Sequence, residues 1–156
     1  MIHSIPELQP QDPNHTGRPE EDSADVILDD HNGIVMDVAV SDEVNGQYYL
    51  ASVGNDYSLY VYTVSKRANH AWNKERAHNS YNMNSLFICS VIDAVTFGHG
   101  SSAGLLFTGG WDSLIRVWNC ENGELVKELD YHDERITDLT VTKDGRYVGV
   151  IDQFDL

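Results

Sequence analysis

The sequence predicts an all-β chain, and three observations lead to that fold class. From Asp25 onward, short runs rich in Val, Ile, Leu, Tyr and Phe alternate with turn residues. No segment keeps a helical period over several turns, and the strand pattern recurs along the chain. With 156 residues, 41% of them hydrophobic, the chain can also bury a core.

The elements follow in order. Residues 1–24 contain all four prolines, several acidic residues and little that is apolar, which predicts a flexible leader. Strands are then expected at residues 26–28, 34–40, 48–53, 58–63, 71–76, 88–97, 104–108, 114–119, 124–129, 135–141 and 146–151. The pairs Asn45-Gly46, Asn122-Gly123 and Asp144-Gly145 tolerate positive φ, so they predict tight turns between these strands.

The chain repeats itself internally. Residues 26–40 align with residues 126–141 through Leu28 and Leu129, His31 and His132, Val35 and Ile136, Asp37 and Asp138, Val38 and Leu139, and Val40 and Val141. A middle copy starts near His78, although its next strand, "VIDAVTF", arrives later than in the other copies and places Ala94 at the aspartate position. Two copies continue into a turn and a strand, with equal spacing from Asp56 to Tyr62 and from Asp112 to Trp118.

This pattern resembles the WD repeat of β-propellers over residues 25–151. The resemblance implies antiparallel four-stranded blades, with repeats at roughly 26–64, 71–119 and an incomplete 124–156. A WD propeller has about four strands per blade and roughly 4–8 blades. We therefore expect an incomplete propeller: a fragment or truncated form of a larger one, a chain that completes a ring with itself or another chain, or an open arc.

The resemblance also implies a hydrogen-bond network in each blade, in which a histidine, a Ser/Thr hydroxyl and a tryptophan N–H meet the turn aspartate. The residues concerned are His31, Ser52 and Asp56 in the first copy, His78, Thr108, Asp112 and Trp118 in the second, and His132 in the third. Tyr62 occupies the tryptophan place of the first copy, so its network should lack one bond. Val150 lies near the hydroxyl place of the third.

A catalytic interpretation uses the same residue types, because Ser, His and Asp form hydrolase triads. The trio recurs once per repeat, however, and no Gly-x-Ser-x-Gly turn is present. This favours a structural role and no enzymatic activity, with an enzyme on a propeller scaffold as the alternative. The seven histidines lack metal-ligand spacing, and we expect neither metal nor cofactor.

Binding to a protein partner is the function that the sequence favours. The candidate contact residues are Asp37 and Asp138, at equivalent places on two blades, and Lys66, Arg67, Trp72, Lys74, Arg76 and Tyr81, in a basic stretch of an acidic chain. The alternatives are two solvated aspartates, an outer-strand position for Trp72, and basic residues that only balance acidic blades.

The formal net charge of −15 disfavours nucleic acid and anionic membranes as partners. The charge would attract a basic protein surface, or would only maintain solubility. No signal peptide is recognisable, and Cys89 and Cys120 read as reduced thiols. We expect a non-enzymatic scaffold in the cytoplasm, with a nuclear location and a nonfunctional truncated product left open.

Overall fold

The structure is a computed structural model that describes residues 28–66, 72–75 and 90–153, without the side chains of residues 64–66 and 72–75. The described residues form ten β-strands and one 3-10 turn, Gly100–Ser102, and contain no α-helix. The predicted all-β fold class is confirmed. The strands begin and end close to the expected limits, except that the strand expected over 88–97 begins at Ile92. Of the strand expected at 26–28, residues 26 and 27 lie outside the described residues and Leu28 belongs to no strand.

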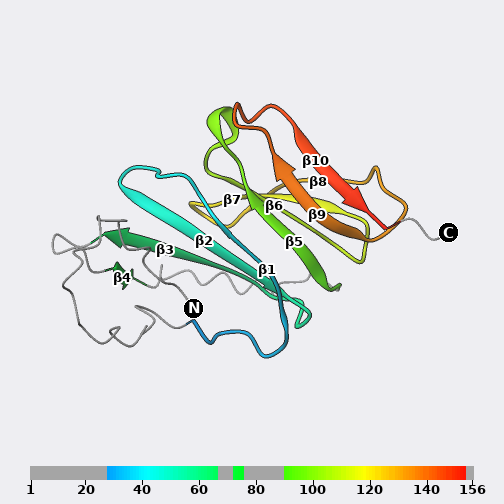
Figure 1. The fold of residues 1–156 in the computed structure, drawn as a ribbon, viewed down its shortest axis with the longest axis horizontal. Helices are drawn as coiled ribbons and strands as arrows, with labels where there is room; N and C mark the ends of the chain where they lie inside the picture. Colours follow the sequence, from blue (N-terminus) through cyan, green and yellow to red (C-terminus); the bar gives the residue numbers. More distant parts are fainter. Residues whose placement is uncertain (1–27, 67–71, 76–89, 154–156) are drawn as a thin grey trace, which may run out of the picture.

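The strands form three antiparallel sheets (Figure 1). The first sheet, or first blade, contains β1 (Val35–Val40), β2 (Gln47–Gly54), β3 (Leu59–Lys66) and β4 (Trp72–Glu75). The second blade contains β5 (Ile92–Phe97), β6 (Leu105–Gly110), β7 (Ile115–Asn119) and β8 (Leu125–Leu129). β9 (Ile136–Val141) and β10 (Val148–Asp152) form the third, two-stranded sheet. Neighbours in sequence pair within each sheet, as in WD-repeat blades.

The three sheets repeat the same register. The ladder shifts after Val35 in β1, after Ile92 in β5 and at the corresponding end of β9, as one extra residue on an inner strand requires. Beyond the bulge, Val38 lies opposite Ser52, Val95 opposite Thr108 and Leu139 opposite Val150. Position-by-position comparison of the blades therefore rests on backbone pairing as well as on sequence.

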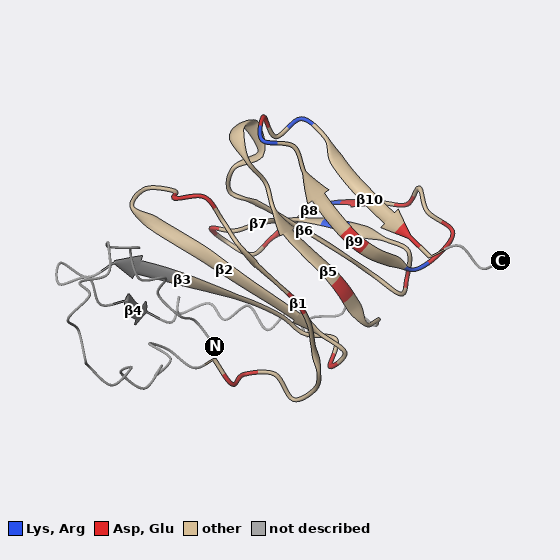
Figure 2. Ribbon diagram, viewed as in Figure 1, with Lys and Arg blue, Asp and Glu red and all other residues tan. Residues whose placement is uncertain are grey.

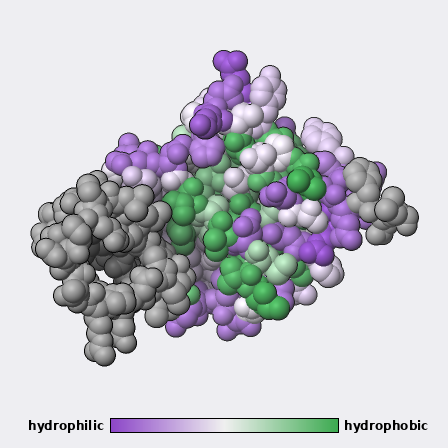
Figure 3. Space-filling model, in the orientation of Figure 1, coloured by the Kyte–Doolittle hydropathy of each residue, from purple (hydrophilic) through white to green (hydrophobic). Residues whose placement is uncertain are grey.

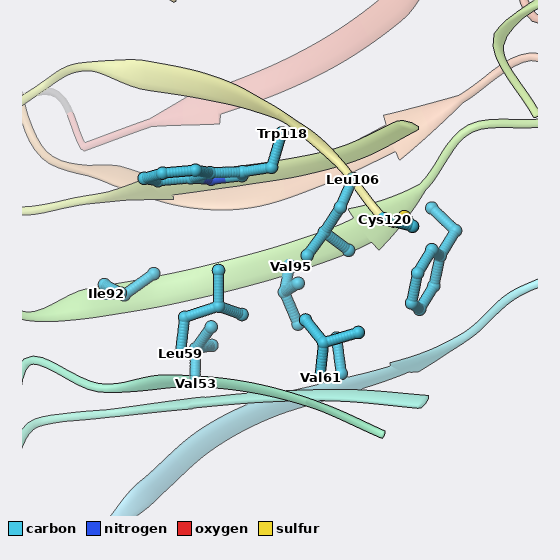
Figure 4. Close-up of a cluster of buried hydrophobic side chains, with 10 residues drawn as sticks. Val53, Leu59, Val61, Ile92, Val95, Leu106, Trp118 and Cys120 are labelled. Carbon is cyan, nitrogen blue, oxygen red and sulfur yellow. The ribbon is translucent and has the colours of Figure 1, made fainter. Parts of the chain in front are cut away.

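The sheets stack so that β1 lies beside β5, and β5 beside β9 (Figure 1). Each blade thus has a leading face, which meets the preceding blade, and a trailing face, which meets the following one. Between the first two blades, Val53, Leu59 and Val61 pack toward the second blade (Figure 4). Ile92, Val95, Leu106 and Trp118 come from the leading face opposite.

A second cluster joins the second blade to the third sheet. Its main members are Phe107, Ile115, Val117, Ile136, Leu139 and Val141. Gly109 is required at this junction, because a Cβ there would lie 2.5 Å from Cγ2 of Ile136. The core therefore consists of two interfaces between blades.

Candidate interaction surface

The leading face of the first blade is open, whereas the same face is buried in the other two sheets. Val38 and Val40 are each 60% exposed. Their equivalents are Val95 and Phe97 in the second blade, which are 4% and 2% exposed, and Leu139 and Val141 in the third sheet, at 6% and 9%. The same apolar interface positions thus occur in all three sheets, and the described residues bury them in the second blade and the third sheet only.

A pocket of about 110 Å³ lies on this open face. Val35, Val38 and Leu50 line its apolar side, and His31 and Ser52 line its polar side. Figure 3 shows hydrophobic residues gathered over the middle of the molecule, where β1 and β5 lie, between hydrophilic margins. A large exposed apolar patch is typical of a protein interface.

Behind the pocket, His31 joins Ser52 to Asp56. Nδ1 of His31 lies 3.0 Å from Oδ2 of Asp56, and its Nε2 lies 2.9 Å from Oγ of Ser52. With a neutral imidazole, Nδ1–H donates to the carboxylate and Nε2 accepts the serine hydroxyl. The amides of Asn32 and Ser58 also donate to Asp56, at 2.8 and 3.2 Å. The three predicted residues of the first copy therefore lie in one network.

Burial and hydrogen bonding act in opposite directions on Asp56. Burial alone would raise the pKa of its carboxyl group, but the hydrogen bonds from His31, Asn32 and Ser58 and the electrostatic interaction with His31 lower it below its usual value. The ionised carboxylate is thus the form that the turn between β2 and β3 favours.

Tyr62, in the tryptophan place, interacts with both Asp30 and Ser52. Its hydroxyl donates to Oδ2 of Asp30 at 3.0 Å, and burial followed by the Asp30 contacts raises the pKa of the phenol. Tyr60 packs its ring edge-on against His31 at 4.7 Å between centroids. Two tyrosines therefore stand on the histidine side of the sheet.

The second blade departs from the expected network. Nε1 of Trp118 donates to Oγ1 of buried Thr108 at 2.9 Å. Asp112 does not join them in the described part of the chain, because the buried guanidinium of Arg116 holds its carboxylate at 2.8 Å and also pairs with Glu128. The network expected around Asp112 stays a prediction, and the Arg116 contact is a charge-assisted bond to the same carboxylate. His78 lies outside the described residues.

The third sheet uses another pair. Nδ1 of His132 lies 2.8 Å from Oδ2 of Asp152, the last residue of β10. Val150, opposite Leu139, takes the place that Ser52 has in the first blade, so it offers the histidine no hydroxyl. Asp152 is at the position of Gly54, and its carboxylate reaches the histidine from there.

Asp37 connects the first two blades. Its Oδ1 accepts the amide of Val38 at 2.8 Å, and its Oδ2 accepts the amide of Val95, on the neighbouring inner strand, at 2.9 Å. Both carboxylate oxygens are thus bonded within the chain, and the assignment of Asp37 as a partner contact stays a prediction. Nδ1 of His99 and Oδ2 of Asp42 make a second contact between the same blades, at 2.7 Å.

A separate cluster connects the second blade to the third sheet. Arg135 makes a bidentate ion pair with buried Asp93, at 2.6 and 2.9 Å, and its guanidinium lies 4.7 Å from the centre of the exposed Trp111 ring. Sequence reasoning missed this cluster and Arg116. The alignment contained a signal, because Arg135 and Asp93 replace the apolar Ile34 and Met36 of the first copy.

The remaining partner candidates separate into two groups. Asp138 is exposed, and the amide of Leu139 donates to its Oδ1 at 2.8 Å. Lys66 ends β3, and Trp72 and Lys74 belong to β4, but their side chains are not described. Arg67, Arg76 and Tyr81 lie outside the described residues, so the basic stretch stays a prediction.

Asp and Glu residues occur on loops and strands of all three sheets (Figure 2). Within residues 28–66, 72–75 and 90–153, no group of three or more His, Cys, Asp or Glu side chains is placed to hold a metal ion. No helix in that same part of the chain is long and apolar enough to cross a membrane.

Comparison with known proteins identifies the repeat. Residues 77–119 match the family model described as WD domain, G-beta repeat. The chain is 30% identical over 88 residues to the COMPASS component SWD3 of Saccharomyces cerevisiae, covering 52% of this chain and 28% of that protein. It is 43% identical over 56 residues to the guanine nucleotide-exchange factor SEC12 of Mus musculus, covering 36% of this chain and 13% of that protein.

The chain therefore spans less than a third of either relative, and their two names describe different roles. The antiparallel sheets supply the architecture of the repeat that the family model matches. The chain contains a WD-repeat family segment, folded as blades of an incomplete propeller.

Proposed function

We propose that this chain is a non-enzymatic WD-repeat scaffold that binds protein through the leading face of its first blade, and that the bound surface is the trailing face of a further WD blade. That blade would belong to a longer form of the chain or to another protein. Cytoplasm is the compartment that we propose, on the sequence grounds given above.

One observation carries the proposal: Val38 and Val40 are exposed where Val95 and Phe97 are buried. Both buried copies are covered by the trailing face of the blade before them, so the interfaces within the chain indicate what fits the open one. That surface is apolar and sheet-like. A structural repeat contacts only its neighbours, so a blade buries its apolar faces against the adjoining blades.

A pair of matched variants tests it. Val38→Asp places a charge on the open face, and Val126→Asp places one on β8, where Val126 is similarly exposed at 57%. Both should fold with an unchanged circular dichroism spectrum. Tagged full-length chain is then captured from cells, and a photo-crosslinking residue at position 40 identifies what touches this face.

The proposal expects a WD-repeat partner, crosslinked at position 40, whose capture falls at least tenfold in the Val38→Asp variant and is unchanged in the Val126→Asp variant. The proposal would be contradicted if wild type, Val38→Asp and Val126→Asp captured the partner equally, or if position 40 crosslinked to no WD-repeat segment.

Hydrolysis is a second candidate, favoured by one observation. Ser52, His31 and Asp56 have the spacing of a nucleophile, a base and an orienting carboxylate, at 2.9 and 3.0 Å. The other sheets fill the same positions with a Thr108–Trp118 bond and a His132–Asp152 pair, which favours strand tethering. A fluorophosphonate probe separates the two, because a catalytic Ser52 would be labelled and a tethering one would not.

A further inference from the structure

Asp138 occupies the position of Asp37 two blades later, in the third sheet. We infer that Asp138 selects the blade that docks on the trailing face of the third sheet: it accepts an inner-strand amide from a blade without an acidic residue at this position, and it disfavours a second copy of this chain. The inference rests on the proposed function, since it assumes that a further WD blade adjoins the described ones.

The first step is the contact between the first two blades. The amide of Val95 follows Ala94, which has no side-chain acceptor, and it donates to Oδ2 of Asp37 on the preceding blade. A carboxylate on one blade therefore accepts a hydrogen bond from an amide on the next blade, where the preceding residue has no side-chain acceptor.

The contact between the second blade and the third sheet shows the reverse case. Leu139 follows Asp138, and its amide donates to Oδ1 of that residue at 2.8 Å. Ala94, on the preceding blade, has no carboxylate to offer. In each of these two interfaces, one carboxylate accepts the inner-strand amide. The carboxylate lies on the preceding blade in the first interface and on the same strand in the second.

The trailing face of the third sheet is the next place where this choice arises. Oδ2 of Asp138 has no hydrogen-bond partner among the described residues, whereas the equivalent oxygen of Asp37 holds Val95. An incoming blade that resembles the second one, with a residue such as Ala94, would supply the missing amide.

A second copy of this chain would not supply it. The amide of Val38 already donates to its own Asp37 at 2.8 Å. Docking β1 of another copy would bury Oδ2 of Asp138 against an occupied amide, and a buried carboxylate without a donor is costly. The shared net charge of −15 adds repulsion between copies.

The test is a double-mutant cycle across two full chains joined in tandem by a flexible linker. The first copy carries Asp138 or the Asp138→Ala change, and the second copy carries Asp37 or the Asp37→Ala change. Urea unfolding of the four proteins gives the coupling between the two positions. The cost of Asp37→Ala within its own chain cancels in the cycle.

In two of the four proteins only one of the two positions, 138 in the first copy or 37 in the second, is an aspartate. These matched pairs should dock more tightly than the mismatched pairs, which have both aspartates or neither. The combined ratio of docking constants should be at least tenfold, equivalent to about 1.4 kcal/mol of coupling. If Asp37→Ala prevents folding, Asp138→Ala alone decides: it should destabilise the single chain, because the Leu139 amide loses its acceptor, and after this loss is subtracted it should strengthen docking in the tandem.

A coupling ratio near one, with docking present, would overturn the selection by Asp138 and leave the proposed function standing. Docking is judged present when Val38→Asp in the second copy destabilises the tandem. Absence of docking in every pair would overturn both, because the matched pairs must dock.

Discussion

Val38 and Val95 occupy the same place in consecutive repeats, and truncation of each to alanine should give very different losses of stability. Removing two methyl-sized groups from a fully buried site costs ~1.6 kcal/mol in transfer free energy. Val95 is 4% exposed, so it should lose nearly all of this, and the cavity left behind should bring the loss to about 2.5 kcal/mol.

Val38 is 60% exposed, so the 40% that is buried should lose about 0.6 kcal/mol. The lower strand propensity of alanine affects both positions and cancels in the comparison. The expected difference is therefore about 2 kcal/mol in the free energy of unfolding, measured by urea titration with equal m-values.

Equal losses for Val38→Ala and Val95→Ala would refute this reasoning, because they would mean that the leading face of the first blade is covered in solution by the chain itself. A concentration-dependent loss for Val38→Ala would instead indicate covering by another copy, and would also contradict the discrimination assigned to Asp138.

Three further outcomes follow from the buried polar groups. Trp118→Phe should cost about 1–3 kcal/mol, because it leaves the buried Thr108 hydroxyl unpaired, and adding Thr108→Val should recover part of the loss; thermal or urea unfolding measures both. The folded-state pKa of Asp56 is lowered, so its contribution is present above the unfolded pKa of about 3.9 and is lost as the pH falls through the folded value; the stability advantage of wild type over Asp56→Asn should shrink below about pH 4 in pH-dependent denaturation. Burial raises the pKa of the Cys120 thiol to about 12, so Cys120 in a native Cys89→Ser protein should react slowly with a thiol reagent at pH 8 and rapidly in denaturant, and fast labelling of Cys120 in the native form would contradict its placement in the core.

The sequence by itself determined the all-β class and the strand positions. Alternating apolar residues and turn pairs such as Asn45-Gly46, whose φ angles are 53° and 78°, act locally, so they can be recognised without tertiary structure. The trio of His31, Ser52 and Asp56 could also be anticipated, because the resemblance to WD repeats implies it.

Tertiary structure decided which residues the blades share. Asp37 looked like a solvent-facing partner contact until the second inner strand brought the Val95 amide to it. Arg135 reaches Asp93 across 42 residues, and no local period encodes that contact. Val38 and Val95 read alike in sequence, yet one is exposed and the other buried, because burial depends on the neighbouring blade and not on the strand that carries the residue.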